Sequence, residues 1–120
     1  MLMIDHIELR TRDLPASMRF YAAVLAPLGY TQTVDGATKG FGDVRGPDFF
    51  LIAGEPADLA HYAFRAPSRA TVRACYQQGA AFNALDRAPS LAPQVHPNYY
   101  AAYLRDPDGR LVEFTCHEAE

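Results

Sequence analysis

The sequence lacks any excess of basic charge. Its 120 residues carry 11 Lys and Arg against 14 Asp and Glu, a net charge of −3, and no window concentrates Lys or Arg. Proteins that bind nucleic acid or anionic membranes present basic patches, so we expect neither partner. Long hydrophobic runs are missing too, since no stretch approaches the roughly 20 apolar residues of a membrane span.

Cysteine is scarce. Cys75 and Cys116 are the two cysteines of the chain, and they lie far apart rather than in a Cys-x-x-Cys spacing. This excludes a disulfide framework or a zinc knuckle and favours reduced, packed thiols. Residues 1–5 show no basic start followed by a long apolar run, so we predict no signal peptide and expect a cytoplasmic location.

The first half of the chain has the pattern of a strand, a helix and three further strands. Residues 4–11 alternate between apolar and polar side chains, which predicts a strand with one apolar side. Asp13 is a good helix N-cap, and helical spacing predicts a helix from about residue 15 to 26. Short strand-like runs punctuated by glycine follow at residues 30–34, 38–43 and 48–53.

The second half repeats this order. Residues 61–65 alternate as the first strand does, and Ser68 begins a predicted helix that ends near Gly79. His6 and His61 each open a first strand, 55 positions apart. An internal duplication is the simplest interpretation.

The remainder is predicted as a strand, a loop and a hairpin. We predict a strand at 81–85, a Pro-rich loop at 89–97 and a hairpin that turns at Pro-Asp-Gly, residues 107–109. One helix per half is too few to cover both faces of a sheet, so we expect an α+β fold with one uncovered face per sheet. The expected organisation is a single domain with module one at 1–55, a linker at 54–59 and module two at 60–120.

The uncovered faces carry polar side chains. The first strand and its repeat place there His6, Glu8, Arg10, His61, Ala63 and Arg65. Glu113, between Val112 and Phe114, points to the face opposite its neighbours. Two histidines and a carboxylate suit Fe(II), and also Mn(II), Zn(II) or Ni(II), with positions left open for a substrate. The alternative is that both histidines are ordinary strand residues and Glu113 pairs with Arg105 or Arg110.

Several stretches together resemble a known family. They are Asp-His-Ile-Glu-Leu at 5–9, residues 13–21 and 25–30, His-Tyr-Ala-Phe at 61–64, residues 99–103, Asp-Pro-Asp-Gly at 106–109, and Glu113. In this order, over nearly the whole chain, they resemble the vicinal oxygen chelate superfamily of glyoxalase, bleomycin-resistance and extradiol-dioxygenase domains. The resemblance implies two βαβββ modules forming a curved mixed sheet around a metal cavity, and a homodimer.

The resemblance also implies a divalent metal ion as cofactor. Ligands in that family come from the first strand of each module and from the last strand, which here are His6, His61 and Glu113. In glyoxalase I type members the last strand of the first module adds a carboxylate. The corresponding residues here, about 51–53, include no acid, and the nearest, Glu55, lies in the linker. This departure favours a dioxygenase-like or Lewis-acid role over the glyoxalase reaction.

Other residues are candidates for chemistry beside the metal. His96 is either an acid-base group or a solvated loop residue. The hydroxyls of Tyr99, Tyr100 and Tyr103 either donate to a bound oxyanion or belong to cross-strand packing. We take His96 and Tyr100 as the candidates for proton transfer.

The expected function is that of a metal-dependent dioxygenase-like or lyase-like enzyme that chelates a small molecule through adjacent oxygens. Arg10 and Arg65, at paired positions of the repeat, either neutralise an anionic substrate or form salt bridges with Glu8. One alternative is a non-catalytic protein that sequesters a small molecule, as in antibiotic resistance of the bleomycin type. Another is a structural dimer module whose ligand residues no longer bind metal.

Overall fold

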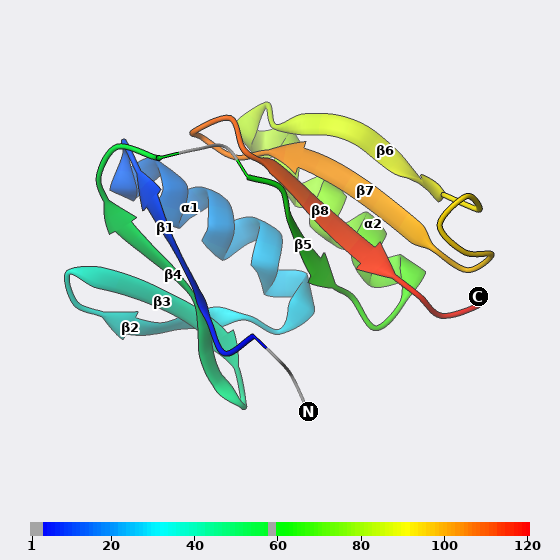
Figure 1. Cartoon of the computed structure of the whole chain (residues 1–120), viewed down its shortest axis with the longest axis horizontal. Helices are drawn as coiled ribbons and strands as arrows, with labels where there is room; N and C mark the ends of the chain where they lie inside the picture. The colour runs from blue at the N-terminus through cyan, green and yellow to red at the C-terminus, as the bar shows by residue number, and fades with distance from the viewer. Residues whose placement is uncertain (1–3, 58–59) are drawn as a thin grey trace.

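The computed structural model describes residues 4–57 and 60–120, and they form two βαβββ modules (Figure 1). The first contains β1 (Ile7–Thr11), α1 (Leu14–Leu25), the 3-10 turn η1 (Ala26–Leu28), β2 (Thr31–Asp35), β3 (Thr38–Asp43) and β4 (Gly46–Ala53). The second contains β5 (Tyr62–Arg65), α2 (Arg69–Gln78), η2 (Gly79–Phe82), β6 (Leu85–Leu91), β7 (Tyr100–Arg105) and β8 (Leu111–Cys116). The predicted α+β class and the repeated order of elements are confirmed.

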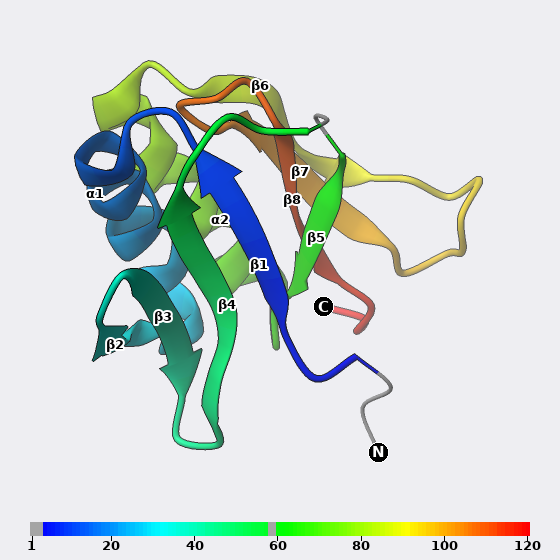
Figure 2. The ribbon, with the colours of Figure 1, turned by 60° about the vertical axis from the view of Figure 1, so that its left-hand side comes forward.

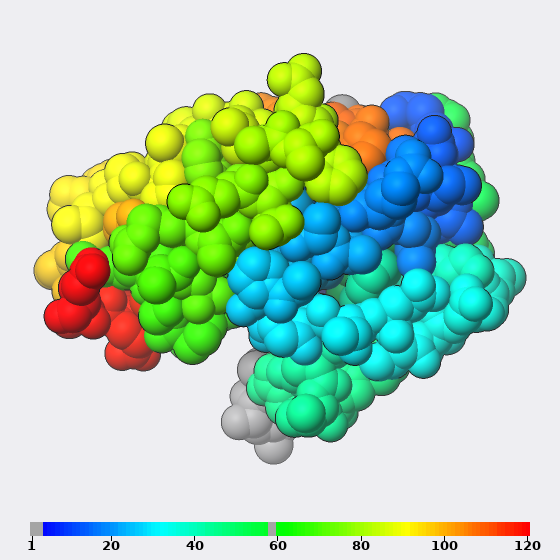
Figure 3. All heavy atoms as spheres, turned by 180° about the vertical axis from the view of Figure 1, so that it is seen from behind, coloured from blue at the N-terminus to red at the C-terminus, as the bar shows by residue number. Residues whose placement is uncertain are grey.

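Each module forms its own four-stranded mixed sheet. The strand orders are β1-β4-β3-β2 and β5-β8-β7-β6, and in both the first strand pairs in parallel with the last. α1 packs on one side of the first sheet and α2 on one side of the second, and the two helices pack against each other (Figures 1 and 3). In the part of the chain that the structure describes, no helix covers the opposite face of either sheet.

Both long helices begin at the predicted caps. The Asp13 carboxylate accepts a hydrogen bond from the Ala16 amide at 3.0 Å, and the Ser68 hydroxyl accepts one from the Thr71 amide at 3.1 Å. Each bond satisfies an amide that the first helical turn leaves without a partner. Among the described residues, no helix is long and apolar enough to cross a membrane.

One strand lies elsewhere than predicted. The strand expected at 81–85 is wrong, because the 3-10 turn η2 occupies its first residues and Asn83 then adopts a left-handed conformation with φ of 55°. β6 instead runs into the predicted Pro-rich loop. Pro89 is tolerated there because β6 is an edge strand whose pairing with β7 shifts register between Arg87 and Ser90.

The core continues from one module into the other through aromatic rings. Phe64 of β5 lies 5.3 Å from Phe49 of the first module and 5.8 Å from Phe114 of the second, measured between ring centroids. Cys75 and Cys116 are buried and free, as predicted. Burial raises the pKa of the Cys75 thiol to about 12, so this thiol is an unreactive part of the core.

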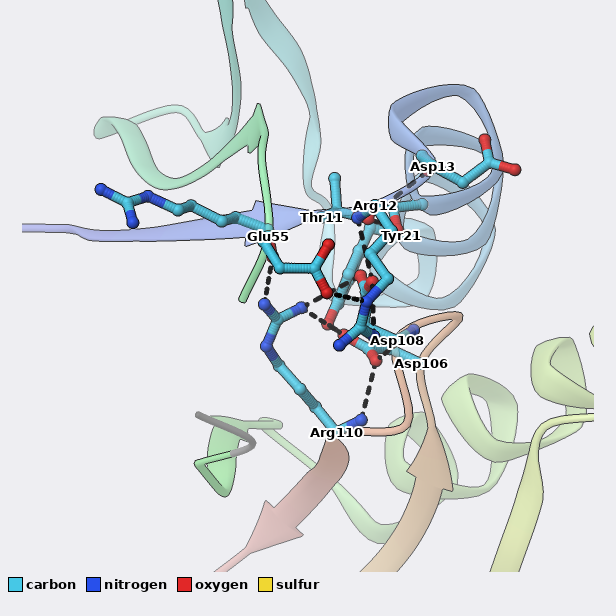
Figure 4. Close-up of polar contacts among 10 residues, drawn as sticks. Thr11, Arg12, Asp13, Tyr21, Glu55, Asp106, Asp108 and Arg110 are labelled. Carbon is cyan, nitrogen blue, oxygen red and sulfur yellow. Dashed lines mark hydrogen bonds and ion pairs between the residues drawn. The ribbon is translucent and has the colours of Figure 1, made fainter. Parts of the chain in front are cut away.

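The Asp-Pro-Asp-Gly turn between β7 and β8 is the centre of a buried polar network (Figure 4). The Asp106 carboxylate accepts hydrogen bonds from the Tyr21 hydroxyl at 2.6 Å and from the Arg110 guanidinium at 3.0 Å. It also accepts from the backbone amides of Asp108 and Arg110, at 3.0 and 2.9 Å. Since Tyr21 belongs to α1, the turn of the second module is bonded into the first.

Two further bonds attach this turn to the end of β1. The backbone amide of Arg12 donates to the Asp108 carboxylate at 3.0 Å, and the Arg110 guanidinium donates to the carbonyl of Arg10 (Figure 4). The ion pair between Arg12 and Glu55, at 2.5 Å, lies at the exposed edge of the network. The turn therefore fixes the position of the beginning of β8, in the second sheet, relative to the end of β1, in the first sheet.

Tyr21 gives this network a dependence on alkaline pH. Burial, then the charge of Asp106 and the hydrogen bond to it, raise the pKa of Tyr21 well above its usual value. Above about pH 10 the unfolded state releases this proton while the folded state keeps it, so stability falls as pH rises. We expect Tyr21→Phe to be less stable than the parent at pH 7, and the difference to shrink above pH 10. Urea unfolding at pH 7 to 11 measures it, and a constant difference would contradict this assignment.

Candidate metal centre

Glu113 is a buried carboxylate on the uncovered face of the second sheet. Its neighbours across the sheet are Ala63 on β5 and Tyr103 on β7. Val112 and Phe114 point to the helix side and are fully buried in the core, so the predicted alternation is confirmed. The Glu113 side chain is 4% exposed. A carboxylate buried to this extent is costly unless polar partners surround it.

Those partners are a histidine and a tyrosine. Glu113 Oε1 lies 2.7 Å from His61 Nε2, and Glu113 Oε2 accepts a hydrogen bond from the Tyr99 hydroxyl at 2.5 Å. His61 is 49% exposed, so the pair opens to solvent on one side. Among the residues that the structure describes, the alternative pairing of Glu113 with Arg105 or Arg110 is not found, because Arg105 pairs with Asp86, and Arg110 with Asp106 and Asp108.

Two tyrosines beside Glu113 are held as neutral hydroxyls. Burial and the hydrogen bond to Glu113 raise the pKa of Tyr99, and burial and the negative charge of Glu113 raise the pKa of Tyr103. Tyr100 lies on the other side of the sheet, where Arg73 donates to its hydroxyl at 3.4 Å and Arg69 lies 5.4 Å from its ring. The structure therefore brings Tyr99, and not Tyr100, to the carboxylate.

His6 lies away from this pair. β1 and β5 run in opposite directions (Figure 2), so β1 begins near the end of β5, where His6 and Arg65 line one cavity, whereas His61 precedes the beginning of β5. His6 Nδ1 is 2.6 Å from the Asp5 carboxylate, and the side chain is 55% exposed. Within residues 4–57 and 60–120, no group of three His, Cys, Asp or Glu side chains is placed to hold a metal ion. One chain thus brings together two of the three predicted ligands.

The sheet register identifies the counterpart of Glu113 in the first module. Glu113 pairs with Ala63, two residues after His61, and Phe50 pairs with Glu8, two residues after His6. The counterpart is therefore Phe50, one residue before the range expected from sequence, and it is not acidic. Its ring makes an edge contact with His6 at 5.5 Å, where the second module has an ion pair.

A second pair of histidines lies next to the carboxylate. His96 Nε2 is 2.9 Å from His117 Nδ1, and the Tyr99 ring contacts both imidazoles edge-on at 5.5 and 5.0 Å. Burial, then the charges of Arg65 and His96, lower the pKa of His117. His117 was not predicted as a site residue. Counting forward from Glu113 two residues at a time, the period of one strand face, leads to Thr115 and then to His117.

Comparison with known proteins identifies the family. The model of the Glyoxalase/Bleomycin resistance protein/Dioxygenase superfamily matches residues 3–114. The chain belongs to this superfamily. A search of curated proteins found no match.

Solved structures of the glyoxalase superfamily share the fold. A glyoxalase/bleomycin resistance protein from Albidiferax ferrireducens T118 is 25% identical, with a TM-score of 0.82 over 98% of this chain and 100% of that one. A lactoylglutathione lyase from Agrobacterium tumefaciens is 22% identical, with a TM-score of 0.67 over 94% and 92%. The fosfomycin resistance protein FosX from Listeria monocytogenes is 17% identical, with a TM-score of 0.71 over 98% and 95%. The last two comparisons concern the fold alone.

Proposed function

We propose that this protein is a metal-dependent enzyme acting on a small molecule that binds the metal through adjacent oxygens. The observation that carries the proposal is the approach of His61 Nε2 to Glu113 Oε1, 2.7 Å apart on an uncovered sheet face. Imidazole nitrogen and carboxylate oxygen together suit Fe(II), Mn(II), Zn(II) or Ni(II). The donor types and their convergence therefore fit a divalent metal ion, with one ligand still to be supplied.

We propose that a second copy of the chain supplies it. His6 is half-exposed on the uncovered face of its own sheet, and among the described residues it forms no three-ligand group with His61 and Glu113. In a twofold dimer, each copy can offer His6 to the partner's pair and receive the partner's His6 in return. Each of the two centres then has three protein ligands, which leaves positions for substrate or water.

The roles of the surrounding residues follow from their contacts. A bound metal ion would polarise a substrate carbonyl or stabilise negative charge developing on its oxygens. Tyr99 holds Glu113 Oε2 by its hydrogen bond, which leaves Oε1 directed to the side of His61. Tyr103, on the neighbouring strand and neutral, can donate its hydroxyl to a substrate oxyanion. His96 does not contact Glu113. It is connected to this face of the sheet only indirectly, by its hydrogen bond to His117.

A sequestering protein is the second candidate. A cavity of about 590 Å³ lies between the modules, where β1 begins and β5 ends, and its walls include Ile7, Phe49 and Phe64. This volume is in the range of pockets that bind small molecules, and such binding needs no chemistry at a metal. Turnover by the metal-loaded protein separates the two candidates.

Metal content tests the ligand assignment. We expect the purified protein to retain about one divalent ion per chain after dialysis, and Glu113→Gln to retain less than about a tenth of that, because an amide oxygen is neutral and binds metal weakly. Inductively coupled plasma mass spectrometry measures it. Glu8→Gln, which removes an exposed carboxylate from the other uncovered face, is the matched control and should keep its metal. A parent without metal, or Glu113→Gln with full metal, would refute the assignment.

A further inference from the structure

The uncovered face of the second sheet continues past the candidate metal centre. Thr115 follows Glu113 two residues later on the same side of β8, and Arg65 of β5 is paired with Thr115 across the sheet. One such two-residue step along a strand is about 6.5 to 7 Å. Arg65 therefore lies about one step from Glu113, on the side away from His61.

Arg65 is an available cation. It is exposed, and among the described residues its guanidinium has no hydrogen bond or ion pair. Arg45, which lines the same cavity, differs because it forms a two-pronged pair with Asp43 at 2.9 to 3.2 Å. Glu118 lines the same cavity as Arg65 but is exposed and forms no ion pair with it. An unpaired guanidinium binds carboxylate, phosphate or phosphonate oxygens well.

His117 adds a hydrogen-bond donor beside Arg65. The Asn98 amide donates to His96 Nδ1 at 3.1 Å, so neutral His96 carries its proton on Nε2 and donates it to His117 Nδ1. Neutral His117 must then carry its own proton on Nε2. This chain of bonds fixes the tautomer of His117 and leaves its Nε2–H as a donor for a bound group.

Small side chains separate this end from the metal centre. Ala63 lies opposite Glu113, and Ala101 lies opposite Thr115, so the β5 side of this face carries only small side chains between Glu113 and Arg65. Tyr99 lies on the β7 side, with its ring against His117 and its hydroxyl on Glu113. Ala63, Arg65 and His117 also line the cavity of about 590 Å³. A short molecule can therefore lie along the sheet from Glu113 to Arg65.

We infer that Arg65 and His117 bind the anionic end of a small organic acid whose other end carries the adjacent oxygens bound at the metal centre. The inference rests on the proposed function and names its substrate class. One two-residue step between the two ends suits a spacer of about two or three carbon atoms. The acid is thus short and carries negative charge at the end remote from the metal.

A pair of 2-oxo acids tests this. 2-Oxoglutarate and 2-oxopentanoate share the adjacent oxygens, but only the first carries a distal carboxylate. We expect 2-oxoglutarate to bind the zinc-loaded protein about tenfold more tightly, and Arg65→Gln to remove the difference while keeping its zinc. Calorimetric titration measures both affinities, and the same titrations on chelator-treated protein show whether the preference needs the metal.

Arg87→Gln is the matched control. It removes the same charge from the same face, where Arg87 lies 4.0 Å over the Tyr103 ring. The inference requires that this variant keep the preference for 2-oxoglutarate. The inference would be overturned if the parent bound the two acids with equal affinity, or bound neither up to about 10 mM. It would also be overturned if Arg65→Gln and Arg87→Gln lost the preference for 2-oxoglutarate equally. A protein that binds no zinc but still prefers 2-oxoglutarate would refute the proposed function and leave the anion site standing.

Discussion

Replacing Asp106 with alanine should lower the free energy of unfolding by about 3 to 5 kcal/mol, the largest stability effect that we expect of any single polar substitution. Asp106 and Arg110 side chains are 0% and 3% exposed, so the substitution leaves a buried guanidinium without its main counter-charge. The Tyr21 hydroxyl and two amides of the turn lose their acceptor as well. Urea unfolding followed by circular dichroism measures the change.

Asp86→Ala is the matched control for that experiment. It breaks the ion pair between Asp86 and Arg105, whose side chains are 26% and 53% exposed. Exposed pairs contribute less than about 1 kcal/mol, so this variant should remain close to the parent. Adding Arg110→Met to the Asp106→Ala protein should recover part of the loss, because it removes the uncompensated charge. A similar loss in the two single variants would show that the buried network does not stabilise the fold.

Mixing two metal-deficient variants should restore metal binding if the centre is shared between copies. His6→Ala lacks the ligand that each chain contributes to its partner's centre. Glu113→Gln lacks a ligand that each chain contributes to its own centre. In an exchanged 1:1 mixture half of the dimers are hybrids, and each hybrid has one complete centre out of two. We therefore expect metal in about a quarter of the sites of the mixture and almost none in either variant alone.

The control mixture combines His61→Ala with Glu113→Gln. Both changes affect the same half of the centre, so no pairing of these chains contains a complete ligand set. Metal content of the dialysed mixtures and the mass of the assemblies by light scattering are the two measurements. If the first mixture gained no metal although its chains exchanged, His6 of the partner would not be a ligand.

Local sequence patterns were sufficient to predict much of the second half of the site. Alternation along β8 placed Glu113 on the uncovered face, and the repeat placed His61 at the start of β5. Both inferences rely on the two-residue period of a strand, which is a property of the chain itself. The contact between His61 and Glu113 needs only that β5 and β8 be neighbours in one sheet, as they are.

The position of His6 could not be predicted in the same way. Its distance from His61 depends on how the modules pack, with β1 and β5 running in opposite directions (Figure 2). That packing arises from contacts between α1 and α2 and from the Asp106 network, and neither leaves a periodic signal in the sequence. Tyr99 was within reach of prediction, since counting back two residues at a time from Tyr103 leads to it.

Strand register was the other source of error. The counterpart of Glu113 fell one residue from the expected range, because sequence spacing alone does not show which residue of β4 lies opposite Glu8. β6 was misplaced because Pro89 suggested a loop, and proline is compatible with an edge strand. Which strand lies at an edge is decided by the topology of the whole sheet.

The hydrogen bonds around the Asp-Pro-Asp-Gly turn hold the two modules of one chain at a fixed separation. Arg110 is bonded to the carbonyl of Arg10, so the end of β1 and the beginning of β8 are held together. His6 lies four residues before Arg10 along the chain, and Glu113 lies three residues after Arg110. The separation between the two half-sites of one chain is thus set by covalent strand lengths. In a twofold dimer that separation fixes the distance between the two metal centres, and neither centre can be reshaped by a hinge at this junction.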